Sequence, residues 1–158
     1  MRPVESGDLL SLHAIFIDPG VRRYLCDDEI VSREWVENEI AASISLFERL
    51  GCGLWCIFLA DQRSLIGFCG YRFFHEPPEL QLLFGLLPEH WSKGLATEAA
   101  TAMIKFGFEE LGFERIIASA DAPNVASHRV MEKAGMVFEK RVTLAGIDTV
   151  YYSVAREK

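Results

Sequence analysis

The segment PEHWSKGLATEAA, residues 88–100, decides the fold because it joins two different hydrophobic patterns. The apolar run 80–87 before it has the composition of a strand, and the pattern of Ala, Met and Phe that follows, up to Gly112, is typical of a helix. The segment therefore predicts a strand, a short loop and a helix, with Gly94 and Ala96 at the turn. The first N–H groups of such a helix lack intrahelical partners, and the helix dipole adds partial positive charge there. A phosphate or pyrophosphate is the expected ligand, because small residues let an anion approach the backbone.

This segment resembles the acyl-CoA pyrophosphate loop of the GNAT N-acetyltransferases, whose pattern is Arg/Gln-x-x-Gly-x-Gly/Ala and which is WSKGLA here, residues 91–96. The Trp in the first place, the Lys-Gly pair and the TEA that follows at 97–99 are similar to the RimJ/RimL branch. A second segment, NVASHRVMEKAGM at 124–136, resembles the Asn-x-x-Ser…Glu-Lys-x-Gly-Phe pattern of the same branch. Two motifs in the right order are more specific than either motif alone. The resemblance covers most of the chain.

The remaining patterns predict a single α/β domain. Residues 1–4 can form only a stub of a first strand, residues 21–31 are expected to be irregular, and Ser32 and Gly51 mark the ends of a long helix. Helices are expected over residues 7–17, 33–50, 94–111 and 125–134, strands over residues 54–60, 64–74, 79–87, 114–120, 137–144 and 149–155, and turns at 61–63, 75–78 and 145–148. This order, β-α-α-β-β-β-α-β-α-β-β, together with the resemblance implies the GNAT fold, a mixed and largely antiparallel central sheet flanked by helices. The length suits one acetyltransferase domain over residues 1–158.

The charge and the cysteine pattern argue against several classes of protein. The net charge is −7 and the pI is near 5.1, whereas nonspecific nucleic-acid binding needs a basic face. An anionic membrane surface is disfavoured for the same reason. The four cysteines (26, 52, 56 and 69) form no C-x-x-C pair and the four histidines are scattered, so we expect no metal site and reduced thiols. With no signal peptide and no apolar run long enough to span a bilayer, the protein is expected in the cytoplasm.

The resemblance implies an acetyl-CoA site at the first motif. Backbone N–H groups of the loop would bind the pyrophosphate, namely those of Ser92, Lys93, Gly94, Leu95, Ala96 and Thr97. The Lys93 side chain would add charge or simply lie in solvent. The preceding strand would carry a bulge, so that Leu86 and Leu87 pair with the pantetheine arm like an added strand, although both leucines also suit a plain core. The N–H of Leu86 would face the thioester oxygen and stabilise the negative charge that develops on it.

The second motif implies two further candidates. Asn124 would contact the pantetheine or thiol region of CoA, although an Asn before a helix is equally an N-cap. Ser127 would hydrogen-bond the CoA sulfur and help the thiolate leave, although a Ser in a first helical turn can also cap the helix or face solvent. Other GNAT branches place a Tyr general acid seven residues after the Asn, where this chain has Met131. Ser127 is therefore the better acid, directly or through a water.

The general base is the least well marked residue. Related chains often carry a Glu on the strand before the loop, where this chain has Gln81, and an amide is not a base. Glu79 lies on the same strand face and could act through a water, or could be a solvated strand-end carboxylate, while His75 lies further off. A site without a strong base favours a peptide α-amine, with a pKa of about 7.7–8.0, over a lysine at about 10.4. The acceptor pocket would lie between residues 18–32 and the last hairpin, where the acidic residues 27–29 either attract a cationic amine or are solvated.

These expectations combine into one predicted activity. The chain would be an acetyl-CoA-dependent N-acetyltransferase in which a primary amine attacks the thioester directly in a ternary complex, with a protein or peptide N-terminal α-amine as the preferred acceptor. One alternative is an enzyme that acetylates a small-molecule amine. Another is a CoA-binding sensor module with little catalysis, which Gln81 and Met131 favour. Many members of the family form dimers, so a homodimer is one possible assembly, although no stretch of the chain indicates an interface.

Overall fold

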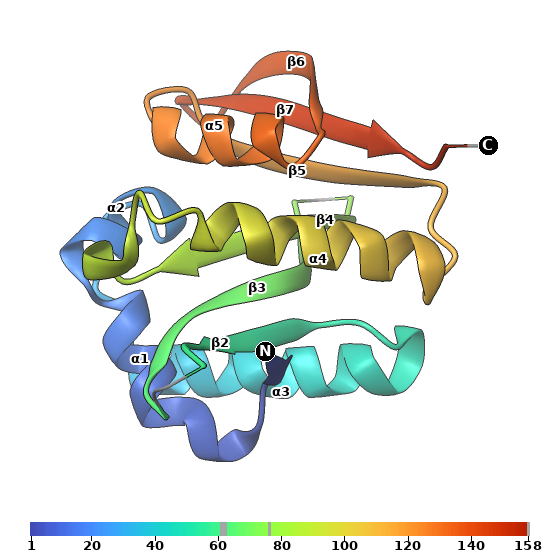
Figure 1. The fold of residues 1–158 in the computed structure, drawn as a ribbon. Helices are drawn as coiled ribbons and strands as arrows, with labels where there is room; N and C mark the ends of the chain where they lie inside the picture. The colour runs from blue at the N-terminus through green and yellow to red at the C-terminus, as the bar shows by residue number, and fades with distance from the viewer. Residues whose placement is uncertain (61–62, 76, 158) are drawn as a thin grey trace.

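The computed structural model describes residues 1–60, 63–75 and 77–157. Its strands form two antiparallel sheets (Figure 1). The four-stranded sheet has the order β1 (Arg2–Pro3), β2 (Leu54–Phe58), β3 (Leu65–Phe74), β4 (Glu79–Leu86), and the three-stranded sheet has the order β5 (Arg115–Asp121), β7 (Ile147–Ala155), β6 (Val137–Leu144). The predicted α/β class is confirmed, but the ladder hydrogen bonds divide the strands into two sheets where a single sheet was expected.

Helices lie on both sides of these strands. They are η1 (Ser6–Asp8), α1 (Leu9–Phe16), α2 (Pro19–Leu25), α3 (Arg33–Leu50), η2 (Pro88–His90), α4 (Leu95–Glu109) and α5 (Val125–Lys133). Figure 1 shows α4 crossing the middle of the molecule, with α5 and the three-stranded sheet above it and α1 and α3 below. Within the described residues, no helix combines the length and the apolar composition that crossing a membrane requires.

The long helix α3 begins and ends as its sequence predicts. The Ser32 hydroxyl oxygen accepts a hydrogen bond from the Trp35 N–H at 3.0 Å, and Gly51 ends the helix with φ of 72°. A side-chain N-cap and a left-handed residue after the last turn satisfy backbone groups that the helix itself leaves open. These two local interactions define the ends of α3, and the Ser43 hydroxyl, which accepts from the Leu54 N–H at 2.8 Å, joins the helix to β2.

The two faces of β4 are buried by different helices. Leu82 and Leu86 pack in a cluster with residues of α4, whereas Leu83 packs in a cluster with residues of α1 and α3. Side chains alternate along a strand, so Glu79 and Gln81 lie on the same face as Leu83. This alternation places the candidate base on the opposite face of β4 from α4.

The structure corrects the expectation of an irregular segment over 21–31, because Pro19–Leu25 form α2. The Asp18 carboxylate caps this helix by accepting from the Gly20 N–H at 2.8 Å, and Pro19 occupies the first turn. A proline is favoured at that position because its fixed φ suits a helix and its missing N–H is not needed there. The sequence Asp18-Pro19-Gly20 therefore both follows the end of α1 and starts a new helix.

Two further differences concern turns and strand ends. β7 begins at Ile147 rather than at 149, because Ala145 (φ 48°) and Gly146 (φ 81°) form a two-residue turn with positive φ at both positions. β4 pairs with β3 in one continuous register from Phe74 opposite Glu79 to 67 opposite 86, so the expected bulge is absent from this pairing. The turns predicted at 61–63 and 75–78 lie partly outside the described residues.

Candidate functional site

The loop before α4 leaves the N-terminus of that helix open. Gly94 is the N-cap with φ of 79°, no side chain caps the first turn, and a Cβ on Gly94 would meet nothing within 4 Å. Ser92 also has a positive φ of 59°. The first backbone hydrogen bond of the helix runs from the Glu98 N–H to the Gly94 carbonyl at 2.9 Å, so the N–H groups of 95–97 precede it and need another partner. An uncapped turn with free space in front of it fits a pyrophosphate.

Trp91 anchors this loop to the end of β4, a contact that the sequence did not predict. Its indole N–H donates to the Leu86 carbonyl oxygen at 2.7 Å. On the other side, α2 packs against the loop so closely that a Cβ on Gly20 would lie 2.7 Å from Pro88 and 3.0 Å from the Trp91 ring. The loop is therefore held between the strand that precedes it and the helix α2. In the sequence, Trp91 matches the first position of the loop motif, but the motif assigns it no contact.

The backbone N–H and carbonyl of Leu86 face the side of β4 that is not paired with β3. The Leu87 N–H donates to the Ile66 carbonyl at 2.9 Å, and hydrogen bonding to one neighbour alternates along an antiparallel strand. The Leu86 N–H and carbonyl therefore point away from β3. The carbonyl accepts the hydrogen bond from Trp91, and the N–H is left for a ligand. The Leu87 N–H is already used by the sheet, in contrast to the expectation that this residue pairs with the pantetheine arm. The Leu86 side chain is core, so the side-chain and backbone roles coexist.

Asn124 and Ser127 meet at the start of α5. The Asn124 side-chain oxygen accepts from the Ser127 N–H at 3.3 Å, so Asn124 is the N-cap of this helix. The His128 Nε2 lies 3.1 Å from the Asp121 carbonyl oxygen and 3.2 Å from the Ala122 carbonyl oxygen, which fastens the end of β5 to α5. Because the cap uses only its oxygen, the Asn124 amide nitrogen and the half-buried Ser127 hydroxyl remain able to bind a ligand.

Glu79 belongs to a polar network that the sequence did not predict. The Gln81 amide nitrogen donates to a Glu79 carboxylate oxygen at 2.8 Å, and the Gln81 oxygen accepts from the Ser119 hydroxyl at 2.7 Å. Tyr151 lies directly opposite Ser119 in the pairing of β5 with β7, and its hydroxyl is 3.0 Å from the His75 Nε2. Burial, together with the negative charge of Glu79, raises the pKa of Tyr151. Residues from three strands and one turn therefore surround the candidate base.

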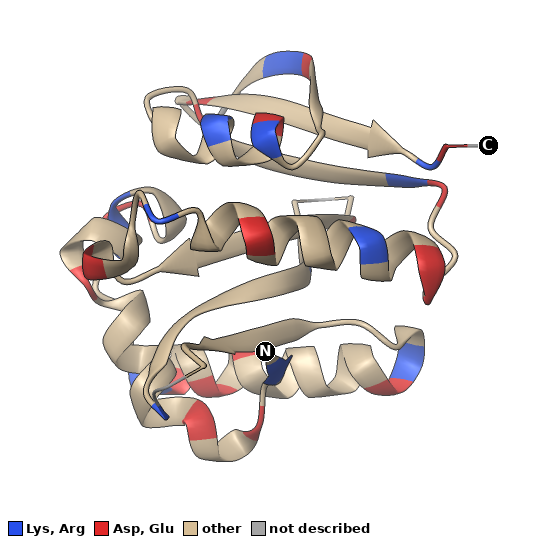
Figure 2. Cartoon of the chain, viewed as in Figure 1, with Lys and Arg blue, Asp and Glu red and all other residues tan. Residues whose placement is uncertain are grey.

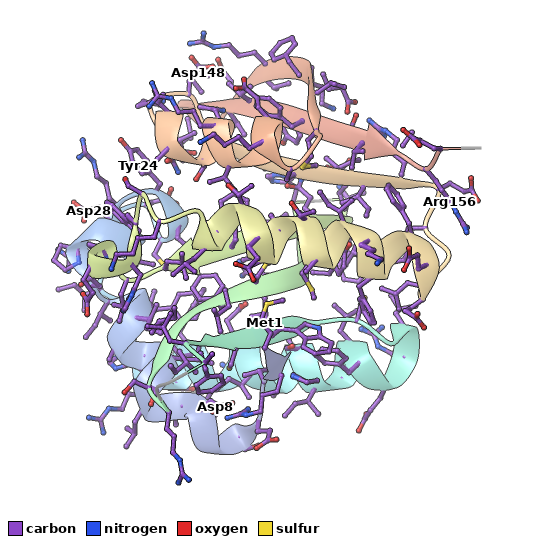
Figure 3. The ribbon with its side chains drawn as sticks, viewed as in Figure 1. Met1, Asp8, Tyr24, Asp28, Asp148 and Arg156 are labelled. Carbon is purple, nitrogen blue, oxygen red and sulfur yellow. The ribbon has the colours of Figure 1, made fainter. Side chains whose placement is uncertain are left out.

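The acidic segment between α2 and α3 reaches the end of β5. Burial raises the pKa of Asp121, and the charge of Asp27 raises it further. Figure 3 places Tyr24 and Asp28 at the end of the molecule where α2 lies against the loop before α4. In Figure 2, acidic and basic residues are interspersed over the visible face.

The four cysteines are free thiols in the structure. Burial raises the pKa of Cys26 to about 11 and that of Cys56 to about 12, the latter with a contribution from the charge of Asp8. Burial also raises the pKa values of Cys52 and Cys69. These thiols therefore stay protonated near neutral pH, and the protonated form is a poor nucleophile.

Comparisons with known proteins find a relative in sequence and solved structures of similar fold. The chain is 36% identical over 166 residues to an uncharacterized N-acetyltransferase, YnaD, of Bacillus subtilis, a match that covers 100% of this chain and 94% of that protein. The structure of RimL, a ribosomal L7/L12 alpha-N-protein acetyltransferase in complex with coenzyme A, superposes with a TM-score of 0.81 at 16% identity over 98% of this chain and 92% of that one. An aminoglycoside acetyltransferase, also in complex with coenzyme A, superposes with a TM-score of 0.77 at 18% identity over 98% of this chain and 93% of that one.

The two solved structures share the fold of this chain, and their low identity limits the comparison to the fold. The family model described as an acetyltransferase (GNAT) domain matches residues 1–137, which include the loop before α4 and the start of α5. This chain therefore belongs to the GNAT acetyltransferase family and is an N-acetyltransferase.

Proposed function

We propose that residues 1–158 act as one domain that transfers an acetyl group from acetyl-CoA to a primary amine, with a protein or peptide N-terminal α-amine as the first acceptor to test. The observation that carries this proposal is the uncapped N-terminus of α4 beside the outward-facing backbone of Leu86. Acetyl-CoA supplies the activated acetyl thioester. The protein supplies binding, orientation and proton transfer.

The residues around α4 and α5 would hold the donor substrate. Backbone N–H groups of 92–97 bind the pyrophosphate, and the exposed Lys93 adds positive charge. The Leu86 N–H donates to the thioester oxygen, where negative charge develops as the amine attacks. The Asn124 amide contacts the pantetheine arm. The Ser127 hydroxyl lies at the start of the same helix and would donate to the sulfur.

Proton transfer would involve Glu79 and Ser127. As the carbon–nitrogen bond forms and the carbon–sulfur bond breaks, the amine gives a proton to Glu79, directly or through a water. The sulfur leaves as a thiolate that accepts a hydrogen bond from the Ser127 hydroxyl, and solvent water then protonates it. The cysteines, with pKa values raised by burial, offer no thiolate for an acyl-enzyme, which favours direct attack. Much of the rate increase would come from holding the two substrates together.

Two classes of acceptor are supported by different observations. An α-amine, with a pKa of about 7.7–8.0, is at least about half neutral near pH 8, which suits a half-exposed carboxylate base better than a lysine amine would. RimL is named for acting on a protein α-amine. A small cationic amine is favoured instead by the acidic residues 27–29 between α2 and α3, and one structural neighbour is named for acting on aminoglycosides.

Thermal unfolding with and without acetyl-CoA tests the donor site. Acetyl-CoA at about 100 times its Kd should stabilise the protein by about 2.7 kcal/mol, because the folded state alone binds it. Mass spectrometry of a peptide panel and a small-amine panel then identifies the acceptor, with N-terminally blocked copies of the same peptides as controls. Acetylation of free but not blocked peptides supports the α-amine, and acetylation of small amines alone supports the second class. If the melting temperature rises with neither acetyl-CoA nor CoA, that result contradicts the donor site.

A further inference from the structure

Gln81 is a buried amide that is hydrogen-bonded at both ends. It is only 1% exposed, its nitrogen donates to Glu79 at 2.8 Å, and its oxygen accepts from Ser119 at 2.7 Å. Placing a polar side chain in a strand that otherwise packs as core is unfavourable unless its hydrogen bonds are made. A buried position of β4 is therefore occupied by an amide side chain that contacts the candidate base.

The orientation of this amide is set by its partners. An ionised carboxylate only accepts hydrogen bonds, so the nitrogen of Gln81 has to face Glu79 and the oxygen has to face Ser119. The reversed orientation would place the Gln81 oxygen against the carboxylate and leave the Ser119 hydroxyl without its acceptor. Ser119 thus fixes Gln81, and Gln81 fixes one oxygen of Glu79, which leaves the second oxygen for a proton.

The same amide connects the two sheets. β4 and β5 share no backbone ladder in the described part of the chain, yet Gln81 on β4 and Ser119 on β5 are joined side chain to side chain. A carboxylate at the start of β4 would otherwise be free to adopt several rotamers, because a glutamate side chain has three rotatable torsions. Through Gln81, its position becomes tied to the three-stranded sheet.

Tyr151 and the groups in contact with it lie on another side of Glu79. Tyr151 from β7 is close enough for the charge of Glu79 to raise its pKa, and its hydroxyl is 3.0 Å from His75 in the turn after β3. The Lys140 ammonium of β6 lies 4.8 Å from the centre of the Tyr151 ring. Asp121 follows Ser119 by two residues on the same face of β5. The direct hydrogen bond to the Glu79 carboxylate comes from the side-chain N–H of Gln81.

We infer that Gln81 is a positioning residue of the acetyl transfer: it holds the Glu79 carboxylate in a fixed orientation for accepting the amine proton, and Ser119 holds Gln81. This inference rests on the proposed function, since it concerns the base of that reaction.

The first test is steady-state kinetics of Gln81→Met in the full chain, with acetyl-CoA and the amine identified by the acceptor panels. We expect kcat to fall about tenfold, because the base is displaced from its productive geometry. The KM for acetyl-CoA should be unchanged, since Gln81 does not reach the α4 terminus. Ser119→Ala should give a smaller loss of the same kind. Ser43→Ala is the matched control, because it removes another buried hydrogen bond, between Ser43 and the Leu54 N–H at 2.8 Å, and should leave kcat unchanged.

The second test is the pH profile of kcat/KM for Gln81→Glu. Two carboxylates side by side repel each other, which raises the pKa of one of them. The acidic limb of the profile should therefore move to higher pH. The acceptor amine titrates identically in both assays, so its own ionisation cancels in the comparison. The limb moves only if the titrating base is the carboxylate next to position 81, so a base elsewhere in the site would leave it in place. An acidic limb that stays in place, together with a kcat of Gln81→Met within twofold of the unaltered protein, would overturn the inference.

A third test needs no acceptor. Unfolding of Gln81→Met, Glu79→Ala and the double variant should show that the double variant loses less stability than the two single losses added together, because both substitutions remove one shared hydrogen bond. Strict additivity would overturn the contact on which the inference rests. Failure of the proposed function would show separately, as an unaltered protein that neither binds acetyl-CoA nor acetylates any amine.

Discussion

At Gly94 the backbone needs a residue without a side chain for two separate reasons. Its φ of 79° lies in the left-handed region, and the space in front of it is where the pyrophosphate would lie. Gly94→Ala should therefore lower the free energy of unfolding by about 1–2 kcal/mol through backbone strain. It should also weaken acetyl-CoA binding about tenfold, or about 1.4 kcal/mol, because the added methyl group keeps the anion from the backbone. Calorimetric titration and chemical unfolding measure the two effects separately.

Gly112→Ala provides the matched control for this prediction. Gly112 has φ of 69° and a Cβ there would also meet nothing within 4 Å, but it lies beyond the other end of α4. The control should lose a similar amount of stability and keep its affinity for acetyl-CoA. Equal affinities for acetyl-CoA in the two variants would contradict the placement of the pyrophosphate at Gly94.

At the scale of the elements, α3 and α5 are capped in the same way but differ in their distance from the site. Asn124 caps α5 through the Ser127 N–H, and Ser32 caps α3 through the Trp35 N–H. Replacing either cap by Ala should cost about 1 kcal/mol of stability, since one backbone N–H loses its partner. Only Asn124→Ala should also weaken acetyl-CoA binding in the thermal-shift assay. If Ser32→Ala weakened that binding equally, the loss would reflect general destabilisation rather than a contact of Asn124.

At the scale of the whole molecule, one partly buried ion pair makes the stability depend on pH. Asp8 is 8% exposed and forms two hydrogen bonds with the Arg2 guanidinium, at 2.7 and 2.8 Å, which join η1 to β1. The hydrogen bonds from Arg2 hold the pKa of Asp8 below its ordinary value, against the opposing effect of burial, with a further contribution from the Glu5 N–H. The folded state therefore binds the Asp8 proton less readily than the unfolded chain does. The pair stabilises the fold fully above the unfolded pKa of about 3.9, and this stabilisation is lost as the pH falls below it.

Asp8→Asn tests this dependence by urea unfolding at a series of pH values. Near pH 7 the variant should be less stable by about 1–3 kcal/mol, because a charged hydrogen-bond partner is removed from a buried site. The two stability curves should converge in acid, where Asp8 of the unaltered protein is protonated as well. Asp148→Asn is the control, since its pair with Arg141 is fully exposed and should contribute little. A constant offset between Asp8→Asn and the unaltered protein down to the acid limit would argue against the ion pair as the source.

Much of this architecture is determined locally. The strand, loop and helix around Gly94, the ends of α3 at Ser32 and Gly51, and the cap at Asn124 all follow from neighbouring residues, because turns and caps are made by groups a few positions apart. The same local reasoning failed at Pro19, because a proline both ends one helix and suits the first turn of the next. The alternation of side chains in β4 could also be predicted, and it put Glu79 and Gln81 on one face.

The contacts that turn this face into a site come from the tertiary structure alone. The sequence gives no reason why Gln81 meets Ser119, why Trp91 closes on Leu86, or why Asp27 comes near Asp121, since these partners are 5 to 94 positions apart and lie on different elements. Packing of α2 against the loop, and of β5 beside β4, brings them together. The sequence by itself determined the donor motif, because an anion site at a helix terminus is made by consecutive backbone groups. Only the folded chain decided how the base is held, because side-chain hydrogen bonds across two sheets depend on the order in which their strands lie.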